Sequence, residues 1–195
     1  EEERKKVSHF FHAEWGASQH PFRYSNDVDE NLDKITSSTS ANERDGDFLL
    51  TGGEARVSKD GTWSESYACN LIDWHLKEQL TMDSLTGSAY WTFKDFGTPL
   101  RPGNPIPYIN QKGVVQRDFT PKESYYVFQS YWAEKPMVHI FGHTWTLRYA
   151  DTGEKQLVKI YSNCNEVELY INETPKIFLQ LVYDGKFLLT KGKTK

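Results

Sequence analysis

Residues 7–13 form a short apolar segment rich in residues of high β propensity. This pattern predicts a strand that leads to Glu14, Trp15 and Gly16 at its carboxyl end. The next stretch, from residue 18 to about residue 47, is polar, rich in Ser, Asn and Asp, and without periodicity. A loop of this length is uncommon inside a compact domain and tends to be functional. We therefore expect a functional loop directly after the first strand.

A helix is predicted where a capping pattern precedes apolar residues at helical spacing. Thr62 and Glu65 match the ends of a capping box, in which a hydroxyl and a carboxylate bind free N–H groups of the first turn. The apolar positions that follow form two stripes: Trp63, Tyr67, Leu71 and Trp74, and then Ile72, Leu76 and Leu80. The apolar face is wide, so we expect this helix to be buried over much of its girth.

A second strand and a second helix follow in the same order. Residues 85–93 have the composition of a strand, and Thr120 and Glu123 match another capping box with Pro121 at the first helical position. The order strand, helix, strand, helix over residues 1–132 predicts parallel βα units, and the fold class is therefore α/β.

The pattern changes at residues 133–136. Short strands are predicted beyond this point, at residues 138–145, 156–162 and 167–171, with a hairpin across Asp184 and Gly185. The remaining chain is shorter than the roughly 100 residues of an immunoglobulin-like sandwich. We therefore expect one domain over residues 1–135 and a truncated β-sandwich over residues 136–195.

The composition of the chain argues against two classes of protein, nucleic-acid binders and membrane-spanning proteins. The chain has 195 residues, of which 37% are apolar and 26% charged, as in ordinary globular proteins. Its net charge of −4 argues against nucleic-acid binding, and no apolar run approaches the roughly 20 residues of a membrane span. Aromatic residues make up 14% of the chain. Such rings stack on sugars in carbohydrate-active proteins, although large rings also fill protein cores.

Cysteine and histidine positions do not favour a metal site or a cofactor. Cys69 and Cys164 are far apart and have no zinc-finger spacing, so both are expected to be buried or half-buried thiols. His9 and His12 would lie on opposite faces of a strand, and adding His20 does not improve the geometry for shared ligation.

Four segments together resemble glycoside hydrolase family 2, the family of β-galactosidases, β-glucuronidases and β-mannosidases. They are HAEWGA at residues 12–17, YWTFKDF at residues 90–96, GVVQRD followed by TPK at residues 113–122, and YSNC with EVEL at residues 161–169. Each motif is weak alone, but the four occur in the order that the family has. The resemblance covers residues 7–172 and fades beyond them.

The resemblance implies the last two βα units of a (β/α)₈ barrel, followed by the start of an immunoglobulin-like sandwich. In that fold reacting groups sit at the carboxyl ends of strands, which is where Glu14 is predicted. Glu14 would be the nucleophile that forms a covalent glycosyl-enzyme ester. Trp91 would form part of the sugar-binding floor, with a core tryptophan as the equal alternative.

Three further residues are candidates to contact the sugar. His12 is expected to share a strand face with Glu14, and Trp15 adjoins the nucleophile but is more suited to packing. Lys94, or Asp95 beside it, is a candidate to reach substrate hydroxyls or to hold Glu14, with a structural ion pair as the alternative.

The implied activity is the retaining hydrolysis of terminal β-glycosides, with β-galactosides as the first choice. No Asn-Glu pair precedes Glu14, so the family's acid/base is expected to lie outside this chain, which alone would be an inactive fragment. The alternative is a non-catalytic carbohydrate-binding or scaffolding piece. We expect a carbohydrate substrate and no nucleic-acid partner, membrane or cofactor. The isolated chain is expected to form a homo-oligomer, to aggregate or to be only marginally stable. A periplasmic or extracellular location in a bacterium is the preferred compartment.

Overall fold

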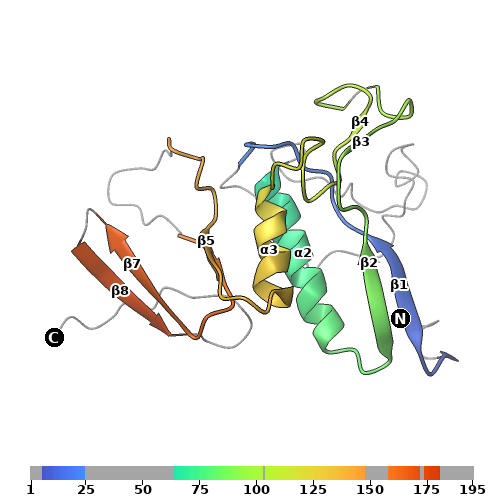
Figure 1. Ribbon diagram of the computed structural model, residues 1–195. Coiled ribbons are helices and arrows are strands. Elements are labelled where there is room, and N and C mark those ends of the chain that lie inside the picture. The colour runs from blue at the N-terminus through green and yellow to red at the C-terminus, as the bar shows by residue number, and fades with distance from the viewer. Residues whose placement is uncertain (1–5, 25–63, 103, 148–157, 172–173, 181–195) are drawn as a thin grey trace, which may run out of the picture. The chain divides into compact units, whose positions relative to one another are not determined.

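The computed structural model describes residues 6–24, 64–102, 104–147, 158–171 and 174–180 (Figure 1). By its internal contacts the chain divides into two compact units, Glu1–Thr120 and Pro121–Lys195. The predicted α/β class is confirmed by helices and strands in both units. The finer assignments, to a barrel, a sandwich and a boundary at residues 135–136, stay predictions.

The first unit is built on two parallel strands joined through a helix. Strand β1 (Phe10–Trp15) pairs in parallel with β2 (Leu85–Tyr90), and α2 (Glu65–Leu80) lies between them in the chain. The blue and green strands lie side by side in Figure 1. The predicted parallel βα order is therefore confirmed for this unit.

Strand β2 ends at Tyr90, earlier than the predicted residue 93. The backbone beyond it pairs with a later segment instead: Thr92 donates to the Lys112 carbonyl (3.2 Å), and Val115 donates to the Phe93 carbonyl (3.0 Å). Two short strands, β3 (Phe96–Gly97) and β4 (Ile109–Asn110), then form an antiparallel pair.

The N-cap of helix α2 lies two residues after the predicted N-cap, Thr62. Its N-cap is Ser64, whose hydroxyl oxygen accepts from the Tyr67 N–H (3.0 Å). The Glu65 carboxylate accepts from the Phe22 N–H (3.1 Å), and the Glu65 N–H donates to the Arg23 carbonyl (2.8 Å). The N-cap is Ser64 and not the predicted Thr62, because the N–H that a cap at residue 62 would bind bonds to a distant carbonyl. Thr62 itself lies outside the described residues.

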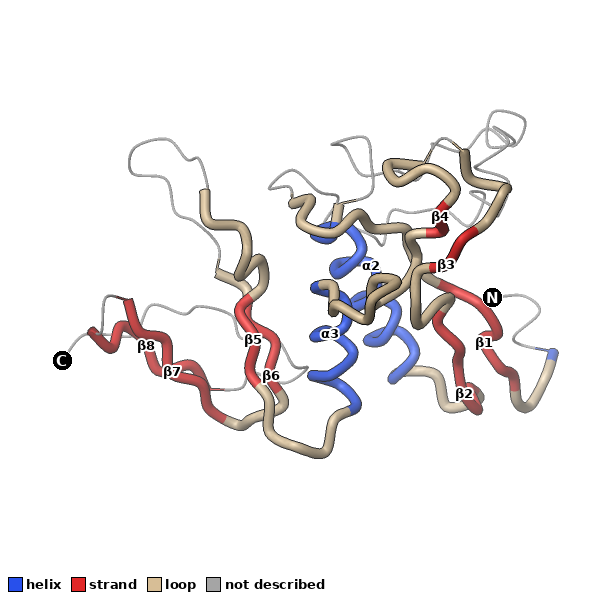
Figure 2. The backbone as a smooth tube through the Cα atoms, turned by 45° about the horizontal axis from the view of Figure 1, so that its top comes forward, coloured by secondary structure: helices blue, strands red, loops and turns tan. Residues whose placement is uncertain are grey.

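The described residues of the second unit form one helix and two antiparallel strand pairs, which can be followed in Figure 2. Helix α3 (Glu123–Trp132) contacts β6 (Ile160–Ser162), which pairs with β5 (Val138–Ile140). Strand β7 (Glu166–Ile171) pairs with β8 (Thr174–Gln180). The hairpin predicted at Asp184 and Gly185 lies outside the described residues.

Two expected boundaries in this unit are corrected. The predicted strand over residues 138–145 ends at Ile140, because the chain turns through Gly142, whose φ is +70°. Helix α3 starts at Glu123 with Lys122 as its N-cap and no side-chain cap, so Pro121 is not its first residue. The Thr120 N–H, which a capping box would bond to the Glu123 carboxylate, donates to Oδ1 of Asp118 (3.0 Å), and the Glu123 carboxylate lies beside two histidines.

The link between α3 and β5 is held by one side chain from the YSNC motif. The Asn163 amide nitrogen donates to the carbonyls of Ala133 (2.8 Å) and Lys135 (2.9 Å). Its amide oxygen accepts from the Met137 N–H (2.8 Å). This asparagine therefore satisfies three backbone groups of a turn that has no regular structure.

Cys69 is buried, Cys164 is half-buried, and both are free thiols, as predicted. Among the described helices none is long and apolar enough to cross a bilayer.

Candidate active site

Glu14 lies one residue before the carboxyl end of β1, with its side chain exposed to solvent. The neighbouring strand ends beside it, since Trp15 is the register partner of Tyr90. The Trp91 N–H then donates to the Trp15 carbonyl (2.8 Å). The two motifs around Glu14 and Trp91 are therefore adjacent at the carboxyl end of the parallel pair.

Gly16 makes this close approach sterically feasible. Its φ is +149°, a conformation that side-chain-bearing residues rarely adopt. A Cβ atom at this position would lie 2.6 Å from the Trp91 carbonyl oxygen and 2.8 Å from Cε2 of Tyr90. The glycine after Glu14 and Trp15 therefore lets two strand ends meet.

Trp91 is partly exposed, at 44% of its surface, and its ring lies edge-on to Phe96 with centroids 6.0 Å apart. The peptide bond between Trp91 and Thr92 is cis. An exposed indole offers a flat apolar face, as a sugar-stacking position requires. The contact with substrate stays a prediction, with a core tryptophan as the equal alternative.

Trp15 and His12 pack toward α2. Trp15 is 6% exposed and lies 5.0 Å from the His75 ring and 5.1 Å from the Tyr90 ring. His12 stacks on Trp15 at 6.1 Å, and its Nδ1 is 3.3 Å from the Gln79 amide nitrogen. This burial agrees with the expectation that Trp15 is more suited to packing than to contact with the sugar.

Burial lowers the pKa of both imidazoles in this cluster. It lowers the pKa of His12, and burial together with the nearby His12 lowers the pKa of His75 to about 4. A shift in strand register falls between His12 and Trp15, which interrupts regular alternation. The expectation that His12 and Glu14 share one face assumed a regular strand, so the substrate contact of His12 stays a prediction.

Lys94 and Asp95 hold the segment that follows β4. The Lys94 ammonium lies 3.6 Å from the centroid of the Phe119 ring, a cation–π contact. Asp95 is 4% exposed, and its Oδ1 accepts from the Gly113 N–H (2.8 Å). Asp95 therefore has a structural role here, and any substrate contact of Lys94 stays a prediction.

Two buried glutamines were missed by the sequence analysis. The Gln19 amide nitrogen donates to the Gly113 carbonyl (3.1 Å), and the Gln19 N–H donates to the Gln111 carbonyl (3.0 Å). The Gln111 amide nitrogen in turn lies 2.8 Å from Nδ1 of His20. These bonds tie the segment after Glu14 to the loop after β4. No local pattern predicts them, because the partners are more than 90 residues apart in sequence.

Several known proteins are similar to this chain. A putative β-glucuronidase of Formosa agariphila is 42% identical over 169 residues, which are 87% of this chain and 20% of that protein. The crystal structure of Parabacteroides merdae β-glucuronidase has a TM-score of 0.78 and 57% identity, covering 92% of this chain and 22% of its own. The chain belongs to glycoside hydrolase family 2. The resemblance drawn from four motifs is thereby confirmed.

Membership of glycoside hydrolase family 2 also rests on a β-galactosidase. The enzyme BoGH2A of Bacteroides ovatus is 32% identical over 166 residues, covering 71% of this chain and 18% of the enzyme. No protein-family profile matches the chain. The chain spans about a fifth of the length of the relatives named here, which are glycosidases by name.

Proposed function

We propose that this chain supplies the nucleophile, Glu14, and part of the sugar-binding floor of a retaining β-glycosidase. The observation that carries the proposal is the place of Glu14, an exposed carboxylate at the carboxyl end of a parallel strand. Trp91 lies at the end of the neighbouring strand, where its backbone is bonded to Trp15. Strand ends of this kind carry the reacting groups in (β/α)₈ barrels.

The proposed chemistry is a double displacement. The Glu14 carboxylate attacks the anomeric carbon, the bond to the leaving oxygen breaks, and a second carboxylic acid protonates that oxygen. Water then hydrolyses the glycosyl ester and restores the Glu14 carboxylate. The second carboxyl must lie about 5–5.5 Å from the first. We propose that it is supplied from outside this chain.

In the proposed architecture β1 and β2 are the last two strands of the barrel, α3 is its last helix, and the chain from residue 136 begins the sandwich that follows it. This arrangement is supported by the parallel pairing of β1 and β2 and by the antiparallel pairs beyond residue 137. Bonds from Gln19 and Asp95 to Gly113 would fix the loops around the site.

We propose a β-glucuronide as the substrate, ahead of the β-galactoside favoured by sequence analysis. Two relatives with high identity over most of this chain, from Formosa agariphila and Parabacteroides merdae, are named β-glucuronidases. A glucuronide carries a carboxylate that a galactoside lacks, and recognition of a carboxylate calls for a cation. Lys94 follows Trp91 by three residues, and the Lys112 carbonyl accepts from the Thr92 N–H (3.2 Å), so two lysines belong to the backbone segments beside Trp91. The β-galactoside stays the second candidate because of the similarity to BoGH2A.

A chimera tests the proposal directly. This chain replaces the matching segment of the Parabacteroides merdae enzyme, which supplies the rest of the protein. The chimera is expected to release nitrophenol from nitrophenyl β-glucuronide. Glu14→Gln keeps the size of the side chain but removes the nucleophile, and it is expected to lower kcat/KM by at least about 1000-fold, or roughly 4 kcal/mol.

Glu134→Gln is the matched control, because Glu134 is an exposed glutamate in the second unit. It should leave kcat/KM unchanged. A folded chimera whose hydrolysis survives Glu14→Gln would exclude Glu14 as nucleophile. A preference for the galactoside would refute the proposed substrate, and a folded chimera without any hydrolysis would favour the non-catalytic alternative.

A further inference from the structure

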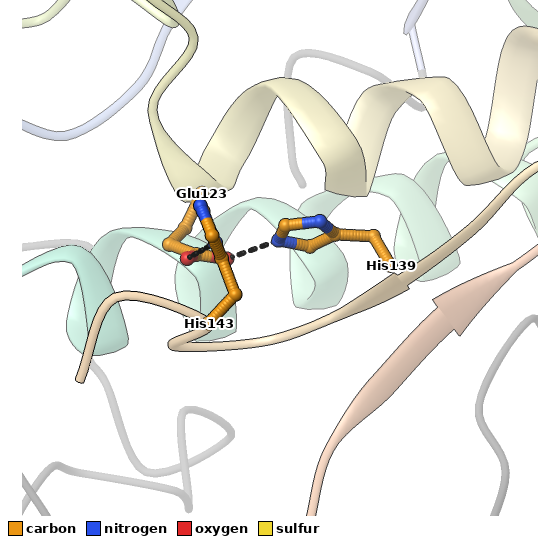
Figure 3. Close-up of side chains that lie close together, drawn as sticks. All are labelled: Glu123, His139 and His143. Carbon is orange, nitrogen blue, oxygen red and sulfur yellow. Dashed lines mark hydrogen bonds and ion pairs between the residues drawn. The ribbon is translucent and has the colours of Figure 1, made fainter. Parts of the chain in front are cut away.

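Three side chains of the second unit converge on one point. Figure 3 shows Glu123 between two imidazole rings. Its Oε2 lies 2.8 Å from Nε2 of His139, and its Oε1 lies 3.1 Å from Nδ1 of His143. The carboxylate and both ring nitrogens lie within 4.8 Å of one another. The sequence analysis considered neither histidine, although their spacing of four residues across a turn was a usable signal.

Separate elements hold the three ligand groups in place. Glu123 is the first residue of α3, and its side chain is 1% exposed. His139 lies in β5 and stacks on Tyr126 with centroids 3.6 Å apart and planes 7° apart. His143 follows Gly142 in the turn after β5, and its side chain is 51% exposed. Two of the three groups are thus fixed by packing, and the third reaches solvent.

The atoms match the ligand preferences of zinc. Zn²⁺ binds imidazole nitrogen and carboxylate oxygen at about 2.0–2.2 Å, and one carboxylate with two histidines is a known zinc ligand set. Tetrahedral ligands at such distances lie about 3.3 Å apart. The observed separations of 2.8 and 3.1 Å between ring nitrogens and carboxylate oxygens are shorter by only a few tenths of an ångström. A small outward shift of the rings would therefore admit the ion.

We propose that Glu123, His139 and His143 bind a zinc ion that joins the first turn of α3 to β5 and the turn after it. Without the ion, the ring nitrogen of each histidine that faces the carboxylate would carry the hydrogen of that bond. When zinc binds, that nitrogen gives up its proton to the other ring nitrogen or to water, and its lone pair coordinates the metal. The exposed side of His143 leaves room for water as the fourth ligand. The site is independent of Glu14 and of the proposed hydrolysis.

Zinc titration of the full chain tests the site. The protein is stripped with a chelator and titrated with Zn²⁺ by calorimetry, and Co²⁺ serves as a spectroscopic probe. We expect one equivalent to bind with high affinity and to raise the melting temperature. His143→Ala removes a ligand on the exposed side, where folding should tolerate it, and should weaken binding by about 100-fold or more. His139→Gln should do the same.

His9→Ala is the matched control, because His9 is an exposed histidine in the first unit. It should bind zinc as the wild type does, and so should Glu14→Gln, which separates this proposal from that of the hydrolase. The Co²⁺ spectrum should lack the intense near-ultraviolet band of a thiolate ligand, which excludes Cys164 as the source of binding. Unchanged zinc affinity in His143→Ala, a thiolate band, or no bound equivalent in the wild type would each overturn the proposal.

Discussion

Gly16→Ala should disrupt the backbone contact between the carboxyl ends of β1 and β2, near Glu14 and Trp91, without removing any functional side chain. The added methyl group would lie 2.6 Å from the Trp91 carbonyl oxygen, well inside van der Waals contact. It would also force alanine to a φ of +149°. The backbone must therefore move, and the hydrogen bond from the Trp91 N–H to the Trp15 carbonyl (2.8 Å) is expected to lengthen or break.

The magnitude follows from two contributions. A residue held in a sparsely populated backbone conformation costs about 1–3 kcal/mol. Overpacking by one methyl group costs about 1–3 kcal/mol more. Partial relaxation relieves some of both, so we expect a loss of about 2–5 kcal/mol in the free energy of unfolding of the first unit. The melting temperature should fall by about 10 °C or more.

Urea unfolding followed by tryptophan fluorescence measures the effect, because Trp15 and Trp91 flank the altered position. Gly97→Ala is the matched control, since a Cβ atom there would meet no atom within 4 Å. That variant should change stability by less than about 0.5 kcal/mol. If Gly16→Ala and Gly97→Ala had the same small effect, the argument that glycine is required at the strand end would be refuted.

Two further variants test the N-cap of α2 and the packed rings of His12, Trp15 and His75. Ser64→Ala removes the N-cap oxygen that accepts from the Tyr67 N–H, and urea unfolding should show a loss of about 0.5–2 kcal/mol. An unchanged midpoint relative to Ser8→Ala, at an exposed serine, would contradict this role. Burial lowers the pKa of His75 from 6.5 to about 4, so the unfolded chain takes up a proton first as the solution is acidified. Stability should be constant above about pH 6.5 and fall as the pH drops toward 4. His75→Gln should flatten the fall, and equally steep profiles for both proteins would disprove the assignment.

The boundaries of α2 and α3 show where prediction from sequence reached its limit. Periodicity placed both helices, but each began later than its capping pattern indicated. For α2, the Glu65 carboxylate binds the Phe22 N–H, a donor 43 residues away. For α3, the Glu123 carboxylate lies between two histidines of the following strand and turn. A capping box is a local pattern, and in both helices an N–H group that the box would use bonds elsewhere, that of Glu65 to the Arg23 carbonyl and that of Thr120 to Asp118.

The features of the candidate site also fall into two groups, those that local sequence predicted and those that it did not. Local sequence was sufficient for the strand before Glu14, for the helical stripes of α2 and for the family, because apolar spacing and ordered motifs are properties of neighbouring residues. The pairing of Trp91 with Trp15, the need for glycine at residue 16 and the bonds of Gln19 join segments far apart in the chain. Sequence alone determined that β1, β2 and the helices α2 and α3 form and that Glu14 lies near the end of a strand. Only the tertiary structure decided what surrounds Glu14 and that Glu123 meets two histidines, because these contacts arise from packing between elements that no local pattern relates.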